Sequence, residues 1–419
     1  MAAHERRIPE LLRHAPAPGV KGFAFLASIE AAARGIMVSV YPLAMYQALG
    51  DAETVSEAYF FIGVAALLAS LVVPALTRLI SRRWTFTVGA LLLAAGALTA
   101  SRGGPLMTPL GLGMTNAGVV CVFICFNAYV MDYIDRANLG ESETLRLFYS
   151  GLAWTVGPIL GVWLMTLWPP APFYIAATAA LVLLGVFWWM RLGDGKLIVA
   201  ARRRTASPLR YLPRFLAQPR LIAGWFFAVI RSVGWWAYVV YMPIYAVEAG
   251  YAKEVGAGFV SMANACLFLT PFMLRWMRRR SVRAAVRTGF LGAALCFLAA
   301  SLAAYQAPPA TIALLAMGAF FLVLLDVSGG LPFLMAVRPH ERTEMAVIYS
   351  SFRDVSGIVT PGAVRLVLAV APLAAVFATA AAALFIAWSV AGRLHPRLGV
   401  SPREGLQPEA KPSNVRAGI

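Results

Sequence analysis

Twelve apolar segments, each close to the length needed to cross a lipid bilayer, dominate this 419-residue sequence. A helix needs about 20 apolar residues to span the hydrocarbon core. The composition agrees, because 60% of the residues are hydrophobic and 13% are charged, against roughly 45–50% and about 25% in a soluble domain. The sequence therefore predicts an all-α integral membrane protein with twelve transmembrane helices. The predicted spans cover roughly residues 22–48, 57–79, 84–101, 109–133, 145–167, 170–191, 221–246, 255–276, 284–305, 309–335, 344–369 and 371–393.

The basic residues predict how the chain lies in the membrane. Of the 36 Lys and Arg residues, thirty fall on the side that holds the N-terminus, four fall inside spans and two fall in loops on the opposite side. Because basic loops stay in the cytoplasm, both termini are predicted to be cytoplasmic. The net charge of +17 follows from this topology and from contact with anionic lipid, so no nucleic-acid partner is expected. We expect a multi-pass protein of the bacterial cytoplasmic (inner) membrane.

The two halves of the sequence repeat at an offset of 200 residues. The matched pairs include Tyr41 with Tyr241, Gly50 with Gly250, Arg83 with Arg283 and Gly157 with Gly357. Parallel repeats of this kind build one class of secondary transporters. The sequence thus predicts two six-helix bundles at 22–191 and 221–393, joined by a basic cytoplasmic linker at 192–220. Residues 1–21 and 394–419 are predicted to be a cytoplasmic N-terminal segment and a disordered cytoplasmic tail.

Five segments carry recognisable motifs. Residues 241–250 (YMPIYAVEAG) and 41–46 (YPLAMY) form an equivalent pair in spans 7 and 1, and residues 337–342 (VRPHER) join spans 10 and 11. Further motif positions are Gly157, Pro158 and Gly161 in span 5, and Arg78, Arg82 and Arg83 between spans 2 and 3. Over about residues 20–395 the chain resembles the major facilitator superfamily, including its span 5 antiporter motif. The resemblance implies a central cavity lined by spans 1, 4, 7 and 10, and motif residues that serve helix packing and conformational change.

Charged residues inside the spans concentrate at one depth. They are Glu30 and Arg34 in span 1, Arg231 in span 7, Asp326 in span 10, and Arg353 and Asp354 in span 11. A rise of about 1.5 Å per residue places all six near the middle of the bilayer, toward the cytoplasm, together with Asn127 of span 4. Because charge in the bilayer core is costly, these residues are candidates for function. Arg365 lies near the outer end of its span, where snorkelling explains it.

Two helix faces combine these charges with aromatic residues. Glu30 and Arg34 are four residues apart and can pair, and the same face continues to Tyr41. On span 7, the face that starts at Arg231 carries aromatic residues on the following turns. An arginine beside an aromatic wall can bind an anionic group and the apolar part of one substrate. The predicted substrate contacts are Arg34, Tyr41, Asn127, Arg231, Trp235, Tyr238 and Tyr245.

Proton coupling is assigned to the charged residues that can exchange partners. These are Glu30, Asp326, Arg353 and Asp354. Motion that separates a carboxylate from an arginine would let the carboxylate take up and release a proton. Structural roles remain open for several of these residues. Glu30 and Arg34 are alternatively a pair that positions span 1, Arg231 is alternatively a bridge to Asp326 or Glu30, and the span 7 aromatics are alternatively ordinary packing. Asp132 and Arg146, at the inner ends of spans 4 and 5, are expected to form a conformational latch.

These features predict a secondary transporter rather than an enzyme. The charged layer contains no His and no nucleophile–base spacing, the chain has no ATP-binding Walker A sequence, and its four cysteines show no metal-ligand pattern. Three arginines face three acids, so protonation of one acid would leave a positive site for an organic anion or zwitterion. We expect proton-coupled export by a monomer without cofactor or metal. The alternatives are a proton-coupled importer and a non-transporting assembly or sensor protein on the same fold.

Overall fold

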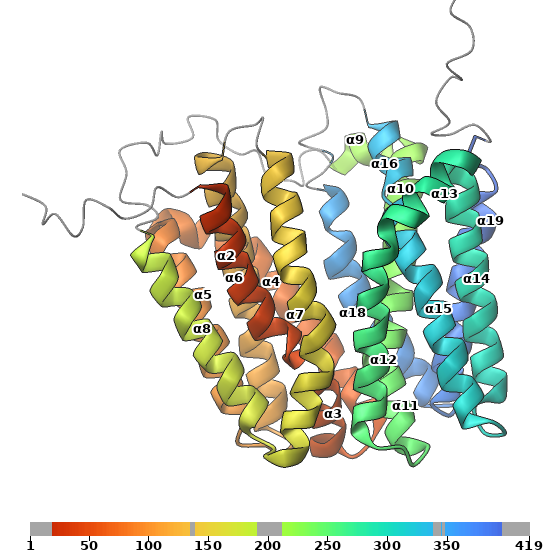
Figure 1. The fold of residues 1–419 in the computed structure, drawn as a ribbon, viewed down its shortest axis with the longest axis horizontal. Helices are drawn as coiled ribbons and strands as arrows, with labels where there is room; N and C mark the ends of the chain where they lie inside the picture. The colour runs from red at the N-terminus through yellow and green to blue at the C-terminus, as the bar shows by residue number, and fades with distance from the viewer. Residues whose placement is uncertain (1–18, 135–138, 191–211, 338–344, 346–347, 396–419) are drawn as a thin grey trace, which may run out of the picture.

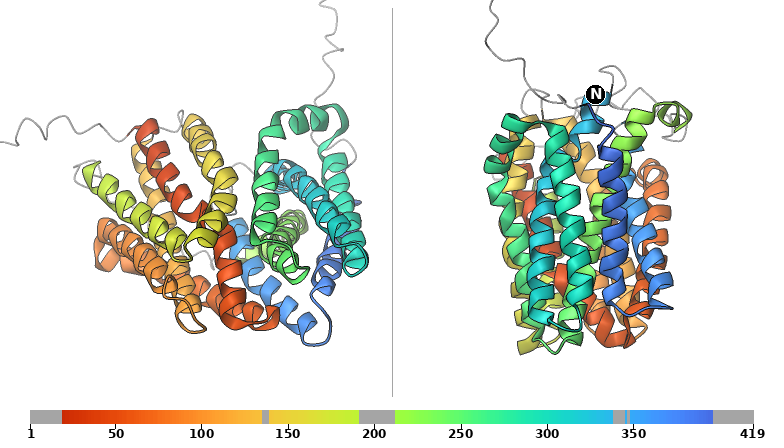
Figure 2. Two further views of the ribbon diagram at one scale, coloured as in Figure 1. Left: turned by 60° about the horizontal axis from the view of Figure 1, so that its bottom comes forward. Right: turned by 90° about the vertical axis from the view of Figure 1, so that its right-hand side faces the viewer.

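The computed structural model describes residues 19–134, 139–190, 212–337, 345 and 348–395, and these contain helices but no strand. The axes of the helices are roughly aligned, and the helices form two bundles (Figures 1 and 2). The predicted all-helical class is therefore confirmed. The outer parts of the predicted terminal segments, most of the linker and the loop at 338–344 lie outside the described residues.

The N-terminal bundle contains span 1 in two pieces, separated at Ile36, and five further long helices. Gly50 ends span 1 in the left-handed conformation with φ 89°, which glycine adopts without steric cost. The Asp51 carboxylate then accepts a hydrogen bond from the Thr54 amide at 2.7 Å and caps the next helix. The helices are α2 (Val20–Gly35), α3 (Met37–Leu49), α4 (Ala52–Leu79), α5 (Ser81–Ala100), α6 (Met107–Tyr133), α7 (Leu139–Leu167) and α8 (Ala171–Trp189).

The C-terminal bundle is less regular. Span 7 contains a π-helix, η3, and span 8 contains a 3-10 turn, η4. Gly250 ends span 7 with φ 84°, as Gly50 ends span 1. The elements are α9 (Leu212–Leu216), α10 (Pro219–Trp236), η3 (Ala237–Tyr241), α11 (Met242–Glu248), α12 (Lys253–Ala265), η4 (Cys266–Leu269), α13 (Thr270–Arg280), α14 (Val282–Ala303), α15 (Pro308–Ser328), α16 (Leu331–Ala336), α18 (Phe352–Leu368) and α19 (Ala374–Ala391).

The described residues contain 11 helical segments that are long and apolar enough to cross a membrane. The remaining predicted span, at 344–369, corresponds to α18, which has 17 residues. Residues 346–347, just before it, lie outside the described part of the chain. The count of twelve spans therefore stays a prediction. It agrees with one feature of Figure 1, in which the start of α2 and the end of α19 lie on the same side of the molecule.

The sequence repeat is visible in the packing of the two bundles. Helix α5 packs against α6 and α8, and its equivalent α14 packs against α15 and α19 in the same way. The Arg83 guanidinium lies 3.8 Å from the centroid of the Trp188 ring, and that of Arg287 lies 5.1 Å from the Trp388 ring. The two tryptophans are 200 residues apart. The same pair of helices is thus joined by an arginine–tryptophan contact in each bundle.

The two bundles meet at the end of the molecule that carries the short loops. Helix α4 packs against α18, and α7 against α12 (Figure 1). A Cβ atom added to Gly63 would lie 2.6 Å from the Gly357 carbonyl oxygen, so the two backbones are in close contact. Four polar contacts join described residues of the two bundles, namely Ser56 Oγ to Tyr241 Oη at 2.9 Å, Ile159 N to Ser261 Oγ at 3.0 Å, Tyr46 Oη to Glu248 Oε1 at 3.0 Å and Arg365 Nε to Glu57 Oε2 at 3.1 Å. Arg365 therefore pairs with an acid instead of only snorkelling as expected.

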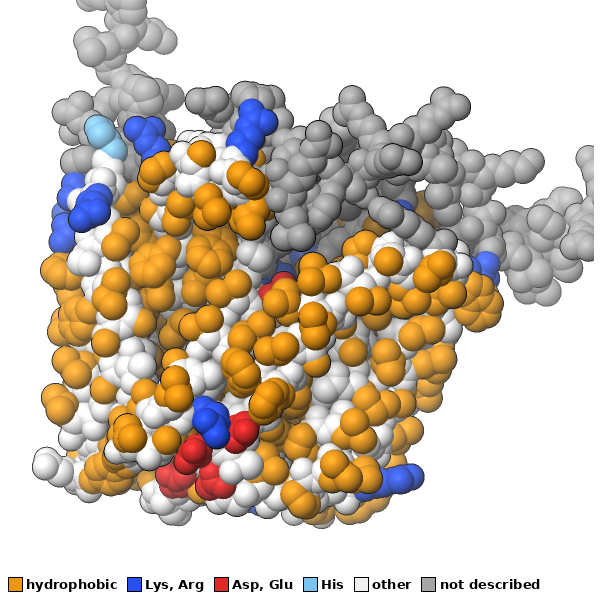
Figure 3. All heavy atoms as spheres, turned by 180° about the vertical axis from the view of Figure 1, so that it is seen from behind, with side chains coloured by type: hydrophobic (Ala, Val, Ile, Leu, Met, Phe, Trp, Pro, Cys, Tyr) orange, Lys and Arg blue, Asp and Glu red, His pale blue; other side chains and the backbone are white. Residues whose placement is uncertain are grey.

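The outer surface between the two ends is apolar. On α4, for example, Phe61, Leu68 and Leu71 are more than half exposed. Figure 3 shows hydrophobic side chains over most of the visible face, with basic groups gathered near its upper edge. Such a belt would be unstable in water but matches the hydrocarbon core of a bilayer.

Candidate functional site

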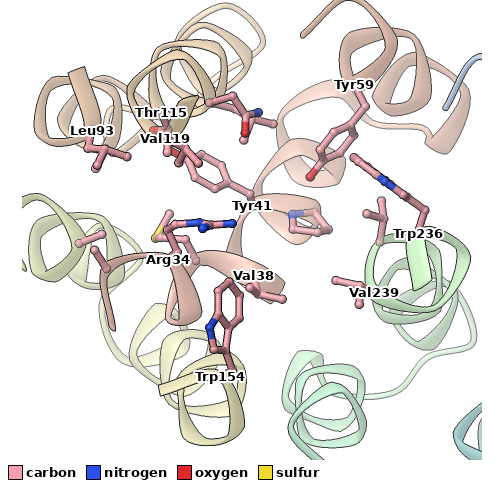
Figure 4. Close-up of a pocket in the computed structure, with 18 residues that line it drawn as sticks. Arg34, Val38, Tyr41, Tyr59, Leu93, Thr115, Val119, Trp154, Trp236 and Val239 are labelled. Atoms are coloured by element: carbon pink, nitrogen blue, oxygen red, sulfur yellow. Dashed lines mark hydrogen bonds between the residues drawn. The ribbon is translucent and has the colours of Figure 1, made fainter. Parts of the chain in front are cut away.

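A cavity of about 300 Å³ lies between the two bundles, and we call it the central chamber. Most of its wall comes from the N-terminal bundle, where Arg34, Tyr41 and Trp154 belong to α2, α3 and α7. The C-terminal bundle contributes Trp236 from the last turn of α10, and Val239 and Val240 from η3. Figure 4 shows Arg34 and Trp154 on one side of the chamber and Trp236 on the other. A molecule bound here would contact both bundles.

A second cavity of about 290 Å³ shares Arg34 with the central chamber, and we call it the arginine cavity. Three guanidinium groups border it, those of Arg34, Arg146 and Arg353, whereas Glu30 is its one bordering carboxylate among the described residues. Glu30 lies one helical turn from Arg34 toward the start of α2, which is the predicted cytoplasmic side. Among the described residues that border the arginine cavity, basic side chains therefore outnumber acidic ones.

Glu30 and Arg34 form the expected pair. The Nη1 of Arg34 donates to Oε1 of Glu30 at 2.9 Å, along the face of α2. The arginine side chain is 34% exposed, and its guanidinium also lies over the Trp154 ring, 5.2 Å from the ring centroid. The carboxylate uses one of the guanidinium nitrogens. Arg34 therefore retains donor groups that can face a ligand in either cavity.

Arg231 is held differently, by an acid on another helix. Its Nε lies 3.2 Å from Oδ1 of Asp326 on α15, but the N–H does not point at the oxygen, so the contact is an ion pair without a hydrogen bond. Trp235 Nε1 donates to Oδ2 of Asp326 at 3.1 Å. The Phe352 ring lies 5.4 Å from the guanidinium. The sequence left open whether Arg231 bridges to Asp326 or to Glu30, and the structure shows the bridge to Asp326.

Arg353 and Asp354 follow each other in α18 but point into different surroundings. The Arg353 guanidinium lies 5.6 Å from the ring of Phe123, which belongs to α6 of the other bundle. It also lies 5.6 Å from the Phe352 ring. Asp354 is half-buried, and no described side chain forms an ion pair with it. Arg353 thus reaches across the gap between the bundles through an aromatic contact.

Asn127 and Tyr41 already have partners inside the N-terminal bundle. Asn127 Oδ1 accepts a hydrogen bond from Nη1 of Arg146 at 3.5 Å. The Tyr41 hydroxyl lies 2.8 Å from that of Thr115, and its ring borders the central chamber. Asn127 therefore positions an arginine of the arginine cavity, whereas Tyr41 presents mainly its ring to a ligand.

The predicted aromatic face of span 7 is interrupted. Tyr238 is fully buried and donates to the Phe259 carbonyl at 2.8 Å, and Tyr245 donates to the Ala304 carbonyl at 2.6 Å. Both tyrosines pack inside the C-terminal bundle, away from the chamber. The span 7 residues that border the chamber are Trp236, Val239 and Val240, so the lining face is displaced by one position from the face that carries Arg231. The π-helix η3, which has more residues per turn, shifts the register only of the residues after it, such as Tyr245. The adjacent residue Trp236 faces the chamber, while Trp235 contacts Asp326.

Sequence reasoning missed three aromatic residues of the chamber, namely Tyr59, Trp154 and Trp236. The rings of Tyr59 and Trp236 meet edge to face across the bundles, with centroids 5.5 Å apart and planes at 82°. Trp154 lies three residues before Gly157. The span 5 motif therefore singled out the helix that carries Trp154, but it did not show which face of that helix lines the chamber. Trp236 is the repeat partner of Ile36, where span 1 is interrupted. The offset of 200 was therefore the one signal that could have pointed to it.

The span 5 motif brings α7 close to α2. A Cβ atom on Gly157 would meet the Gly35 backbone at 2.5 Å, and Gly161 packs as tightly on Ile36. Pro158 lies inside α7, and the following amide, Ile159 N, donates to Ser261 of the other bundle. These residues therefore set helix packing at the interruption of span 1, beside the contact between the bundles.

The other motif residues lie near the inner ends of the spans. The guanidinium of Arg82 lies 5.3 Å from the Tyr129 ring, and that of Arg83 stacks on Trp188. The side chains of Arg78 and Asp132 lie outside the described part of the chain, as does most of the 337–342 motif. The predicted latch of Asp132 and Arg146 with basic loop residues therefore stays a prediction. The described residues include no group of three His, Cys, Asp or Glu side chains placed to hold a metal ion.

Comparisons with known proteins place the chain among transporters. Its fold is similar to those of the nucleoside transporter NupG, with a TM-score of 0.69, 13% identity and coverage of 90% of this chain and 99% of that one. It is similar also to a D-xylose-proton symporter, with a TM-score of 0.70, 10% identity and coverage of 91% and 100%. A bacterial homologue of the iron transporter ferroportin in an inward-facing state gives a TM-score of 0.68, 12% identity and coverage of 89% and 97%. At these identities the likeness shows the fold alone.

The sequence itself identifies the family. No curated protein matches the chain. The family model of the Major Facilitator Superfamily matches residues 23–361. A match of this length, together with the transporter folds, indicates a multi-pass membrane protein that moves a small solute and is not an enzyme. The chain belongs to the Major Facilitator Superfamily.

Proposed function

We propose that this chain exports a small organic anion across the bacterial cytoplasmic membrane in exchange for protons. The observation that carries the proposal is the arginine cavity, where Arg34, Arg146 and Arg353 stand against Glu30. In a medium of low dielectric constant, a guanidinium that keeps unused N–H donors beside its acidic partner, as Arg34 does, favours an anionic ligand. Because residues of both bundles border this cavity, a bound anion would sense the relative position of the two bundles. Alternating access by rocking of the bundles is the mechanism that such a site supports.

The direction of access is argued from where the bundles touch. The four polar contacts between them lie at the short-loop end, which the distribution of basic residues assigns to the outside. The arginine cavity lies nearer the other end. A substrate would therefore load from the cytoplasm in this conformation. Importers and exporters both pass through such a state, so the proposed direction rests on the resemblance of Gly157, Pro158 and Gly161 to an antiporter motif.

Proton coupling is assigned to the Arg231–Asp326 pair. A proton on Asp326 would neutralise the carboxylate and release Arg231 from it. Arg231 could then move closer to Phe352 on helix α18. Glu30 forms a second pair, with Arg34, that we propose as the alternative coupling pair. Both acids are therefore candidates to carry the exchanged proton.

The first experiment compares small molecules inside cells and in their medium, with and without the gene, by untargeted mass spectrometry. We expect an organic anion to be retained inside cells that lack the gene. A compound left unconsumed in the medium would instead indicate an importer and reverse the proposed direction. If no compound differs under several growth conditions, the non-transporting alternative is favoured.

The coupling residue is tested with Asp326→Asn. In proteoliposomes loaded with the anion identified above, this variant should lose at least about 90% of the transport driven by a proton gradient, because the amide cannot exchange a proton. Exchange of labelled for unlabelled anion should persist. Asp51→Asn is the matched control, since Asn caps a helix nearly as well as Asp. Unchanged proton-driven transport in Asp326→Asn would refute the role of this acid.

A further inference from the structure

The polar groups of the central chamber are few, and the hydroxyls that border it are largely paired. The Tyr41 hydroxyl lies 2.8 Å from that of Thr115, and Thr115 donates to the Gly111 carbonyl at 2.9 Å. Asn116 adds one amide to the lining. A substrate that carries many hydroxyl groups would exchange its bonds to water for few bonds here. A mainly apolar substrate body fits this chamber.

Two tryptophans face the chamber from opposite sides. Trp154 comes from α7 of the N-terminal bundle, and Trp236 comes from the end of α10 in the C-terminal bundle (Figure 4). Trp236 is fixed by its edge-to-face contact with Tyr59. Indole rings bind flat aromatic groups by offset stacking or edge contacts. An aromatic ring between Trp154 and Trp236 would therefore be recognised by both bundles at once.

Arg34 is the one charged residue that borders the central chamber in the described part of the chain. Its Nη1 pairs with Glu30, so the remaining N–H groups of the guanidinium can bind a carboxylate in the forked geometry that this group favours. Arg146 and Arg353 border the arginine cavity but not the central chamber. The chamber therefore provides one strong anion contact at one end of an aromatic lining.

From this arrangement we infer that the substrate is a compact aromatic monocarboxylate, with its carboxylate on Arg34 and its ring between Trp154 and Trp236. The inference rests on the proposed transport of an organic anion and narrows it to one chemical class. The chamber volume of about 300 Å³ is at the lower end for ligand sites, so one ring or two fused rings with a short side chain fill it.

The test measures binding of carbon-14-labelled benzoate to the purified full chain in detergent, with unlabelled competitors. Benzoate and 1-naphthoate should compete at least tenfold better than acetate, which lacks the ring, and tenfold better than benzyl alcohol, which lacks the charge. Cyclohexanecarboxylate has the charge and a ring without π electrons. It should compete less well than benzoate and better than acetate. Equal competition by acetate and both aromatic acids would overturn the inference.

Variants separate the ring contact from the charge contact. Trp154→Leu and Trp236→Leu should each weaken benzoate binding about tenfold and leave acetate competition unchanged. Trp163→Leu is the matched control, because Trp163 belongs to the same helix as Trp154 but is 50% exposed on the outer surface. Trp236→Phe retains a ring and should retain most of the preference, which guards against loss of folding in Trp236→Leu. A preference for benzoate that survives both leucine variants would also overturn the inference.

Arg34→Gln distinguishes this inference from the proposed function. It should weaken benzoate and acetate alike by more than tenfold, whereas Arg102→Gln, in an exposed loop, should change neither. If an anion binds in an Arg34- or Arg353-dependent way without preference for an aromatic ring, the substrate class is wrong and anion transport stands. If no carboxylate of the panel and no inorganic anion binds in that way, both proposals fail.

Discussion

Spans 1 and 7 occupy equivalent positions in the repeat, and they share a backbone irregularity but not an electrostatic arrangement. Span 1 is interrupted at Ile36, and span 7 changes from α-helix to π-helix after Trp236, its partner at an offset of 200. Both irregularities border the central chamber. Helix irregularities of this kind often mark functional sites. The repeat thus preserves where the two helices bend.

The arginines of the two helices differ in where their acidic partners lie. Arg34 pairs with Glu30 on its own helix and remains 34% exposed, whereas Arg231 pairs with Asp326 on another helix and is 15% exposed. A pair within one helix constrains little of the fold and leaves the arginine available to a ligand. A pair between two helices fixes their relative position. Under the proposed function, Arg34 of the N-terminal bundle supplies an anion contact, and the Arg231–Asp326 pair of the C-terminal bundle supplies a structural link that can titrate.

The largest expected effect is on stability, from Arg231→Met. Removing one partner of a largely buried ion pair leaves a charge without compensation, so the free energy of unfolding should fall by about 2–3 kcal/mol. Unfolding titrations of the purified protein in mixed micelles measure this change. The double variant Arg231→Met, Asp326→Leu should recover most of it, because it removes both charges. If Arg231→Met alone is as stable as the wild type, the Arg231–Asp326 pair does not stabilise the fold more than the Glu30–Arg34 pair.

A smaller effect is expected from the tyrosines that match in the repeat. The Tyr241 hydroxyl lies 2.9 Å from that of Ser56 in the other bundle, whereas the Tyr41 hydroxyl bonds within its own bundle. Tyr241→Phe should weaken the contact between bundles by about 1 kcal/mol, roughly a fivefold shift in their closed population. Accessibility of a cysteine introduced at the outer ends measures this shift. Tyr41→Phe is the matched control and should leave the accessibility unchanged.

The smallest effect on stability is expected from Arg34→Gln. A partly exposed pair four residues apart on one helix contributes about 0.3–0.5 kcal/mol, so unfolding should change by no more than that. The same unfolding titration gives the comparison with Arg231→Met. A loss as large as that of Arg231→Met would mean that the Glu30–Arg34 pair holds the fold together, and would weaken its assignment to the ligand.

The all-helical architecture could be predicted from the sequence, because membrane spans follow from long apolar runs. The orientation inferred from the placement of arginines stays a prediction. The charged residues near the site were found for the same reason, since an intramembrane charge is rare and costly. The pairing of Glu30 with Arg34 followed from their spacing along a regular helix. The bridge from Arg231 to Asp326 remained one of two options, because sequence does not place spans 7 and 10 side by side.

The aromatic lining was predicted less well. The assignment of Tyr238 and Tyr245 to the cavity face follows from placing Arg231 on that face, whereas the neighbouring face with Trp236 borders the chamber. The π-helix also breaks the period of 3.6 residues per turn before Tyr245. Trp154 and Trp236 lacked any charge or motif to single them out from the eleven tryptophans of the chain. Apolar residues face lipid, neighbouring helices or a cavity with similar composition. Their orientation depends on the packing of all neighbouring helices, which periodicity alone does not fix.

The close backbone contact between Gly63 and Gly357 has a mechanical consequence. Gly63 lies sixteen residues from the inner end of α4, or about 24 Å at 1.5 Å per residue. Any tilt of α4 that keeps this contact in place turns the helix into a lever, and each degree moves its inner end by about 0.4 Å. Two backbones that already touch leave no compressible layer between them to absorb the rotation. A few degrees at this fulcrum would therefore change the width of the opposite end by more than an ångström.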